Sequence, residues 1–404
     1  MKPTHFLSLI ALFALGSCLG QKPSNTESSK GDNSMKNIEF GFNTTYLASS
    51  PKFEVALEKI ANDGFKNVRI YEPFTKQIKK KPELGWNHLN WLKDRGFSVL
   101  LSLSNFPYKN EQDAAQLLKI PSKQRTFPQK AIRYSNRFPP ADVSGYKTHL
   151  NQFMEELKTR EMLSMIDFEI GNEPNAPRYF WGDAEDWKRV RNATSEVLSE
   201  FGEKGLCCGY TSSMFLQETK ERHEQFIADW SEEVKESYQT SFHVYLKTGS
   251  GRAILQNPKL DVSGGVITEY GMYSHYTEEK AILKTSAEYV VGLVKLLEFT
   301  YTNDIEQVYL FPLMDDGAKK ARMGYFDVDG NPKASYDYFK VVWDVLKDGY
   351  NVETTESAIN VIGEQSILML AKQSIQMDSN WNISDASNPG SDQLNEDDWI
   401  IRDR

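Results

Sequence analysis

The fold is decided by residues 166–175, which read IDFEIGNEPN. The stretch begins as an apolar run typical of a buried strand and ends in an Asn-Glu-Pro turn. Because proline cannot donate to a sheet ladder, we expect the strand to stop there, with Glu173 at its carboxyl tip. In parallel α/β proteins such tips face the active site. The alternative is a solvated glutamate in an ordinary turn, since exposed glutamate is common.

Apolar runs of the same kind alternate with helical patterns along most of the chain. The predicted strands cover residues 38–43, 67–71, 97–103, 166–173, 206–210, 241–245, 265–271 and 308–312. The predicted helices cover residues 53–63, 89–95, 146–159, 183–203, 218–233, 278–298 and 335–346. This alternation implies a parallel sheet, and eight units over about 310 residues predict an α/β protein with a single (β/α)8 TIM barrel. The sequence has no Gly-x-Gly-x-x-Gly after its first strand and no Walker-type loop, which disfavours nucleotide-binding folds.

The N-terminus is predicted to be a targeting segment. Lys2 supplies its basic region, and residues 6–15 form an apolar run too short to span a bilayer as a permanent helix. Residues 15–18, LGSC, resemble the bacterial lipobox, in which the cysteine, here Cys18, is lipidated; a plain secretory signal is the alternative. Residues 19–35 are expected to form a flexible tether to this lipid anchor. We therefore expect the protein in the bacterial cell envelope, anchored to the membrane or secreted.

Composition and residue spacing argue against nucleic-acid binding and against a metal site. The chain has 404 residues, 40% of them hydrophobic, and a net charge of -9, which argues against nucleic-acid binding because that needs a basic face. The histidines lack metal-ligand spacing such as His-Glu-x-x-His, and Cys207 and Cys208 are expected to be buried thiols. The sequence therefore calls for no metal and no cofactor. Beyond the barrel of residues 36–350, residues 351–404 are expected to form an extension that is partly strand and is loose from Met377 onward.

Two glutamates are predicted to face each other across the mouth of the barrel. Glu173 follows the fourth strand and Glu269 ends the seventh, and in a closed barrel both strand ends lie on one rim. Paired carboxylates suit glycoside hydrolysis, and a separation of about 5–5.5 Å predicts retention of configuration. One carboxylate then attacks the anomeric carbon while the other carboxyl group protonates the leaving oxygen, so the two need different environments.

The stretches around both glutamates resemble a known group of enzymes. FEIGNEPN (residues 168–175) and ITEYG (residues 267–271) are similar to the strand-four and strand-seven signatures of clan A retaining glycoside hydrolases. The resemblance spans residues 36–350, and GYFDVDGNPK (residues 324–333) is similar to a loop before the last helix in families 39 and 79. It implies that Glu173 is the acid/base and Glu269 the nucleophile.

The same resemblance implies roles for the residues around the pair. Asn172 would hydrogen-bond the sugar 2-hydroxyl, and Arg69 would lie beside the nucleophile. His243 and Tyr245 match a His-x-Tyr pair whose histidine lines the sugar site and whose tyrosine contacts the nucleophile. Each has a structural alternative: an arginine paired to a structural acid, a core histidine, or a tyrosine that only packs.

Further positions are assigned to the sugar site on weaker grounds. Asn43, near the end of the first strand, and Trp181, before a helix, are predicted to contact substrate, although a tryptophan at a helix start is more often part of the core. In the enzymes that this chain resembles, a tryptophan at the end of the eighth strand often forms the floor of the sugar site. This chain has Phe311 and Pro312 there instead.

A long segment after the third strand, residues 105–144, is rich in basic and aromatic residues and is called the basic loop below. Such residues at the mouth of an acidic protein suggest recognition of a uronate or a sulfated sugar; an ordinary solvated loop is the alternative. Its basic residues include Lys119, Lys123, Arg125, Lys130, Arg133 and Arg137, joined after the eighth strand by Lys319, Lys320 and Arg322.

The sequence thus predicts a monomeric enzyme that cleaves a glycosidic bond of an oligo- or polysaccharide with retention. A transglycosylase, which shares every catalytic residue, and a glycan-binding protein without chemistry remain as alternatives. The second has no need for both carboxylates, so their presence argues against it.

Overall fold

The computed structural model describes residues 35–44, 51–71, 82–103, 139–140, 142–176, 179–211, 225–226, 238–247, 262–273, 286–315, 324–355, 358–371 and 399–403. All of them belong to one compact unit, Met35–Arg404. Several predictions fall outside these residues: the signal segment with Cys18, the tether up to residue 34, every basic residue of the basic loop, the three basic residues after the eighth strand, and nearly all of the helix predicted at 218–233.

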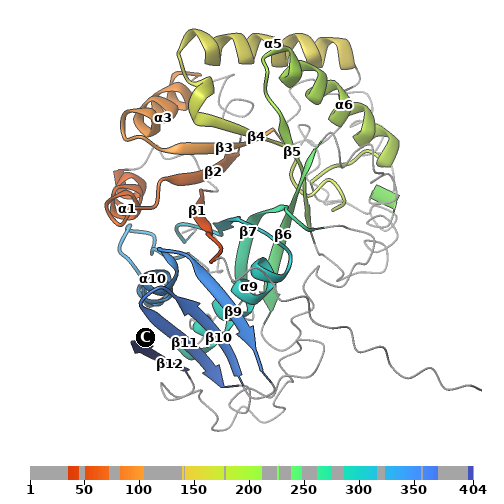
Figure 1. Ribbon diagram of the computed structural model, residues 1–404. Coiled ribbons are helices and arrows are strands. Elements are labelled where there is room, and N and C mark those ends of the chain that lie inside the picture. The colour runs from red at the N-terminus through yellow and green to blue at the C-terminus, as the bar shows by residue number, and fades with distance from the viewer. Residues whose placement is uncertain are drawn as a thin grey trace, which may run out of the picture. The chain divides into compact units, whose positions relative to one another are not determined.

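Eight parallel strands close into a barrel, which confirms the predicted (β/α)8 fold (Figure 1). Each strand pairs with the next along the chain, and β8 pairs with β1 to close the ring. The strands are β1 (Glu39–Thr44), β2 (Asn67–Tyr71), β3 (Ser98–Leu103), β4 (Ile166–Ile170), β5 (Gly205–Thr211), β6 (Gln239–Lys247), β7 (Val266–Tyr273) and β8 (Gln307–Leu310).

Helices alternate with the strands and cover the outside of the barrel (Figure 1). The described helices are α1 (Pro51–Asn62), α3 (Pro82–Asp94), α5 (Val143–Thr159), the 3-10 turn η3 (Leu163–Met165), α6 (Ala184–Glu200), α9 (Ser286–Thr302) and α10 (Ala334–Leu346). Each is amphipathic or largely apolar; on α1, for example, Leu57 and Ile60 are fully buried against the strands.

The strands bury both of their faces, as parallel strands do. Residues such as Phe168 and Ile170 belong to the large core cluster that includes the helices. Leu100, Val266 and Tyr309 form a separate buried cluster, and alternation along the strands places them inside the barrel. The barrel interior is therefore a packed core and not a pore.

Strand β5 is irregular in its middle, and this matters for the site. Its pairing with β6 shifts register between Cys207 and Tyr210, and Gly209 has φ 60°. Cys207 and Cys208 are fully buried, as predicted. The carbonyl of Gly209 is left free to accept a hydrogen bond from the chain beyond β4.

After the barrel, four antiparallel strands form a second sheet in the order β12-β11-β10-β9. Strand β9 (Tyr350–Thr354) contacts α9, β10 (Ala358–Gly363) contacts both α9 and α10, and β11 (Ser366–Ala371) contacts α10. The sequence predicts a loose end to the chain, but Trp399–Asp403 forms β12 and pairs with β11. Its Trp-Ile-Ile start has the strand propensity that the Asn- and Asp-rich residues before it lack. Among the described residues, no helix is both long and apolar enough to cross a membrane.

Candidate active site

Glu173 lies on a turn beyond β4. The strand ends at Ile170, earlier than predicted, because Gly171 at φ 89° already leaves the extended conformation before Pro174 is reached. Glu173 itself has φ 49°, in the left-handed region that residues with a side chain rarely adopt. Its backbone N–H donates to the carbonyl of Gly209 across 2.9 Å, which holds this conformation. Backbone strain of this kind concentrates at functional sites.

Glu269 lies inside β7 and not at its end as predicted, and a bulge decides where its side chain points. In the pairing with β6, Ile267 lies opposite Phe242. The next pair is Glu269 with His243, so Thr268 is an extra residue in the ladder. Regular alternation after Ile267, which packs toward the helices, would turn Thr268 inward and Glu269 outward. The bulge re-aims Glu269 into the barrel, where it contacts side chains of β2 and β6.

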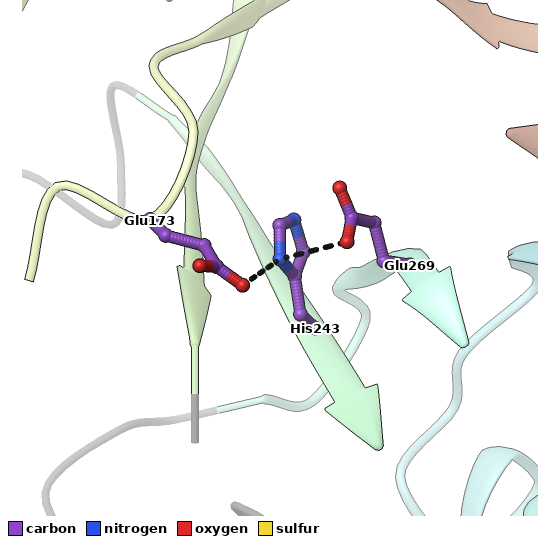
Figure 2. A group of neighbouring side chains, drawn as sticks. All are labelled: Glu173, His243 and Glu269. Carbon is purple, nitrogen blue, oxygen red and sulfur yellow. Dashed lines mark hydrogen bonds and ion pairs between the residues drawn. The ribbon is translucent and has the colours of Figure 1, made fainter. Parts of the chain in front are cut away.

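The two glutamates meet at His243, a residue of β6 (Figure 2). Oε1 of Glu173 lies 2.9 Å from Nδ1 of His243, and Oε2 of Glu269 lies 3.5 Å from the same nitrogen. One oxygen of each glutamate and one nitrogen of His243 all lie within 4.8 Å of one another. Each glutamate is only 2% exposed. The structure therefore brings together two carboxyl groups that stand far apart in the sequence.

Arg69 on β2 binds the two strands that carry the glutamates. Its Nη1 donates to Oε1 of Glu269 at 2.7 Å, and its Nη2 donates to Oδ1 of Asn172 at 2.8 Å. Its Nε also donates to Oε2 of Glu169 at 2.7 Å. Burial by itself would lower the pKa of Arg69, but the charges of Glu169, Tyr71 and Glu269 raise it well above its ordinary value. The site therefore contains a permanent positive charge.

Two tyrosines donate to Glu269, one to each oxygen. The hydroxyl of Tyr71 on β2 donates to Oε1 at 2.5 Å, and that of Tyr245 on β6 donates to Oε2. Burial and the charge of Glu269 raise the pKa of Tyr71 well above its ordinary value, so its hydroxyl remains a donor. With Arg69, these donors give hydrogen bonds to both carboxylate oxygens of Glu269. Tyr71 is missing from the sequence-based assignment, although its position two residues after Arg69 places both on one face of β2.

Glu169 is a second residue that the sequence-based assignment lacks. It lies on β4, is fully buried, and accepts two hydrogen bonds from Arg69 on Oε2. A charged residue inside an apolar strand is the signal that could have found it, because a buried charge needs a partner. Glu169 fits the structural acid that the alternative reading of Arg69 requires, while the same arginine also contacts Glu269.

The remaining predicted residues surround the cluster in different ways. Asn43 is fully buried on β1, and its Nδ2 donates to the backbone carbonyl of Thr268 at 3.2 Å, so it stabilises the bulge. Trp181 is partly exposed just before Asp183, the N-cap of α6, and its contact with a sugar stays a prediction. Phe311 follows β8 and packs edge-on against Tyr245, with ring centroids 5.7 Å apart.

The cluster also has a spacing at which a divalent cation could bind, since Glu173, His243 and Glu269 each offer one ligand atom. Arg69 already places a full positive charge 2.7 Å from Glu269, so a cation would be repelled in a poorly solvated site. The arrangement is better suited to proton transfer and nucleophilic attack on an organic substrate.

Comparison with known proteins bears on the fold. No protein-family model and no curated protein sequence matches this chain. Among solved structures, it is similar to a glycoside hydrolase family 30 subfamily 8 xylanase from Clostridium acetobutylicum, with 12% identity, a TM-score of 0.52, and coverage of 85% of this chain and 82% of the other. It is also similar to a beta-glucosidase from Exiguobacterium marinum, with 11% identity, a TM-score of 0.44, and coverage of 76% and 99%.

A further similarity is to a family 128 endo-beta-1,3-glucanase from Pseudomonas viridiflava, with 11% identity, a TM-score of 0.42, and coverage of 76% and 98%. With its TM-score above 0.5, the likeness to the xylanase shows that this barrel fold occurs in a solved glycoside hydrolase. At these identities the likeness concerns the fold, and the chemistry must be argued from the site itself.

Proposed function

We propose that this protein is a retaining glycoside hydrolase of the clan A type, with Glu173 as acid/base and Glu269 as nucleophile. The observation that carries the proposal is the distance between them: one oxygen of each lies within 4.8 Å of the other inside one buried cluster. Retaining enzymes hold their two carboxyl groups about 5–5.5 Å apart, whereas inverting enzymes need about 6.5–9.5 Å for an intervening water. The fold supports the proposal because such barrels place their sites at the carboxyl ends of the strands.

The environments of the two glutamates fit different roles. Glu269 accepts hydrogen bonds from Arg69, Tyr71 and Tyr245 on both of its oxygens, which orients it as the carboxylate that attacks the anomeric carbon. Glu173 lies 2.9 Å from Nδ1 of His243 and stands at the position that the resemblance to clan A enzymes gives to the acid/base. It is therefore the better candidate to carry a proton in the resting enzyme.

The reaction then proceeds in two steps. In the first, a carboxylate oxygen of Glu269 bonds to the anomeric carbon, the glycosidic C–O bond breaks, and Glu173 gives its proton to the leaving oxygen. In the second, a water molecule loses a proton to Glu173 and attacks the anomeric carbon, which breaks the ester to Glu269. Two inversions give a product of retained configuration.

Substrate contacts are proposed for the residues beside the pair. Arg69 holds Oδ1 of Asn172, which leaves the amide Nδ2 to donate to a sugar hydroxyl such as the 2-hydroxyl. Phe311 is a candidate floor for the sugar ring, since it lies against Tyr245 at the end of β8. Trp181 and His243 are further candidates for contact with the sugar.

Two finer proposals come from the sequence alone. The basic loop favours an anionic glycan, uronate-containing or sulfated, and a chain starting at lipidated Cys18 would act at a membrane surface. Binding of an anionic glycan should weaken with added salt and on replacement of Arg125 or Arg133 by alanine. Binding that is indifferent to both would contradict this choice of substrate.

The test of the function uses wild type, Glu269→Ala and Glu173→Ala on a panel of neutral, uronate and sulfated glycans. We expect cleavage by wild type with retention, followed by proton NMR of the first product, and loss of activity in both variants. Added azide should restore turnover in Glu269→Ala with formation of a glycosyl azide of inverted configuration. Undiminished activity of Glu269→Ala would overturn the assignment. Products formed with added sugar acceptors would identify a transglycosylase instead.

A further inference from the structure

Two buried polar atoms, one on Glu169 and one on His243, lie close to the same glycine, Gly209. Oε1 of Glu169 and Nε2 of His243 have no hydrogen-bond partner among the described residues, and both side chains are fully buried. A Cβ atom on Gly209 would lie 3.1 Å from each of them. Both atoms therefore lie against the same side of Gly209, and a side chain at position 209 would come between them and any molecule that bridges them.

The hydrogen bonds that Oε1 of Glu169 and Nε2 of His243 can form limit which molecule can bridge them. Arg69 donates twice to the other oxygen of Glu169, and a carboxylate paired with a guanidinium offers its second oxygen, Oε1, as an acceptor only. Nδ1 of His243 faces carboxylate oxygens of Glu173 and Glu269, so a neutral ring carries its proton there and leaves Nε2 as an acceptor. Glu169 and His243 form no direct hydrogen bond, so Oε1 and Nε2 each need a donor. A water molecule has two hydrogens and meets both needs at once.

We propose that Glu169 and His243 hold a buried water beside Gly209, and that this water fixes the tautomer of His243. The water donates one hydrogen to Oε1 of Glu169 and the other to Nε2 of His243. A neutral imidazole that accepts at Nε2 carries its proton at Nδ1. Nδ1 is the nitrogen that faces Glu173 at 2.9 Å and Glu269 at 3.5 Å, so His243 becomes a donor toward the pair.

This has a consequence that rests on the proposed function. In the resting enzyme the negative charge of the pair is on Glu269, and after the first step it is on Glu173. A donor between the two carboxyl groups can stabilise whichever is ionised without moving a proton of its own. Glu169 then acts as a positioning residue, since it reaches the reaction only through Arg69 and through the water on His243.

The first test needs only the wild-type protein. Nitrogen-15 NMR of histidine-labelled protein distinguishes the two neutral tautomers, and the signal of His243 is identified by its loss in His243→Gln. We expect a proton on Nδ1 and none on Nε2, together with ordered water density between Glu169 and His243 in a crystal structure. A proton on Nε2, or a dry gap between the two atoms, would overturn the proposal.

A second test displaces the water with a methyl group. Gly209→Ala places Cβ within 3.1 Å of both acceptors, and Gly202→Ala is the matched control because Gly202 also has positive φ, 78°, but meets no atom within 4 Å. We expect loss of the Nδ1–H signal of His243 in Gly209→Ala alone, with kcat/KM lowered about tenfold relative to Gly202→Ala. An unchanged His243 signal in a folded Gly209→Ala protein would contradict the water bridge.

The NMR and crystallographic results do not depend on enzymatic activity. If the water and the tautomer are observed but no glycan is cleaved, the water site stands and the proposed function fails. If glycans are cleaved while His243 carries its proton on Nε2, the function stands and the water bridge fails. Should Gly209→Ala not fold, the wild-type measurement still decides.

Discussion

Nη1 of Arg69 lies 2.7 Å from Oε1 of Glu269, and neither side chain is more than 3% exposed to solvent. An ion pair in such surroundings is screened little, and breaking it leaves a carboxylate buried without its main partner. Because Arg69 also donates to Glu169 and Asn172, one guanidinium orients residues of both β4 and β7. Arg69 therefore positions the nucleophile as well as neutralising it.

Arg69→Lys tests this positioning. A lysine keeps the charge but has a single ammonium group, which cannot reach Glu169, Glu269 and Asn172 in the fixed geometry of a guanidinium. We expect kcat/KM on a cleavable glycan to fall about 100-fold, or about 3 kcal/mol, in protein that remains folded by circular dichroism. The control is Arg191→Lys, which replaces another buried arginine, on α6, and should leave the activity of the folded protein unchanged. Equal activities for the two variants would show that the charge alone matters.

Removing either tyrosine hydroxyl that binds Glu269 should have a different effect from removing the hydroxyl of Tyr270, which follows the nucleophile in the sequence. Tyr71→Phe and Tyr245→Phe each remove one hydrogen bond to Glu269, and a bond to a charged group is worth about 1.5–3 kcal/mol. We expect each to lower kcat/KM about tenfold or more, with a double variant that departs from additivity because both act on one carboxylate.

Tyr270→Phe is the matched control for these variants. Tyr270 follows Glu269 directly, but its hydroxyl donates to the carbonyl of Gly292 on α9 at 2.8 Å. It should lose about 1 kcal/mol of unfolding free energy in a denaturant titration and keep its activity. If it is instead as inactive as Tyr71→Phe, the losses reflect general disruption of β7 and not the missing donors.

The barrel could be predicted from the sequence because its signal is repetitive. Eight apolar runs alternate with helical patterns, and each run tolerates an error of one to three residues at its ends, as β4 and β8 show. The pairing of Glu173 with Glu269 followed from the barrel, since strand ends on one rim must converge.

The details of the site could not be predicted in the same way. The inward turn of Glu269 depends on a one-residue bulge at Thr268, which leaves no mark on the periodicity of β7. The local sequence could have marked Tyr71 and Glu169 as candidates, but the residues that they contact lie on strands distant in the sequence, so it could not have given their partners. The pairing of β12 with β11 is also a long-range contact that an Asn- and Asp-rich approach obscures.

The turn that carries Glu173 depends on a glycine. Gly171 has φ 89°, and a Cβ there would lie 2.3 Å from Cη2 of Trp187 on α6. Gly171→Ala should therefore destabilise the protein by about 2–4 kcal/mol, through both the backbone conformation and the clash, and lower activity by displacing Glu173. Thermal and denaturant unfolding measure the first effect.

Two further variants separate the conformational cost of Gly171→Ala from its clash with Trp187. Gly64→Ala has a similar φ of 95° but meets no atom within 4 Å, so only the conformational cost, about 1–2 kcal/mol, is expected there. Trp187→Phe removes the outer ring atoms and should recover part of the stability when combined with Gly171→Ala. If the combined variant is no more stable than the additive sum, the clash is not the cause.

The stability of the protein in mild acid should depend on His88, a residue of α3 that is 5% exposed. Burial lowers its pKa from 6.5 to about 4, so the folded protein keeps His88 neutral while the unfolded chain takes up a proton below about pH 6.5. The unfolded state therefore binds more protons between pH 6.5 and pH 4, and the unfolding free energy falls by about 3 kcal/mol as the pH drops across this window.

His88→Leu should remove this part of the loss, because leucine does not titrate. The difference in unfolding free energy between the variant and wild type, from urea titrations, should be constant above pH 7 and should shift in favour of the variant toward pH 4. Carboxylate titrations contribute equally to both proteins, so two parallel pH curves would mean that His88 is protonated in the folded state.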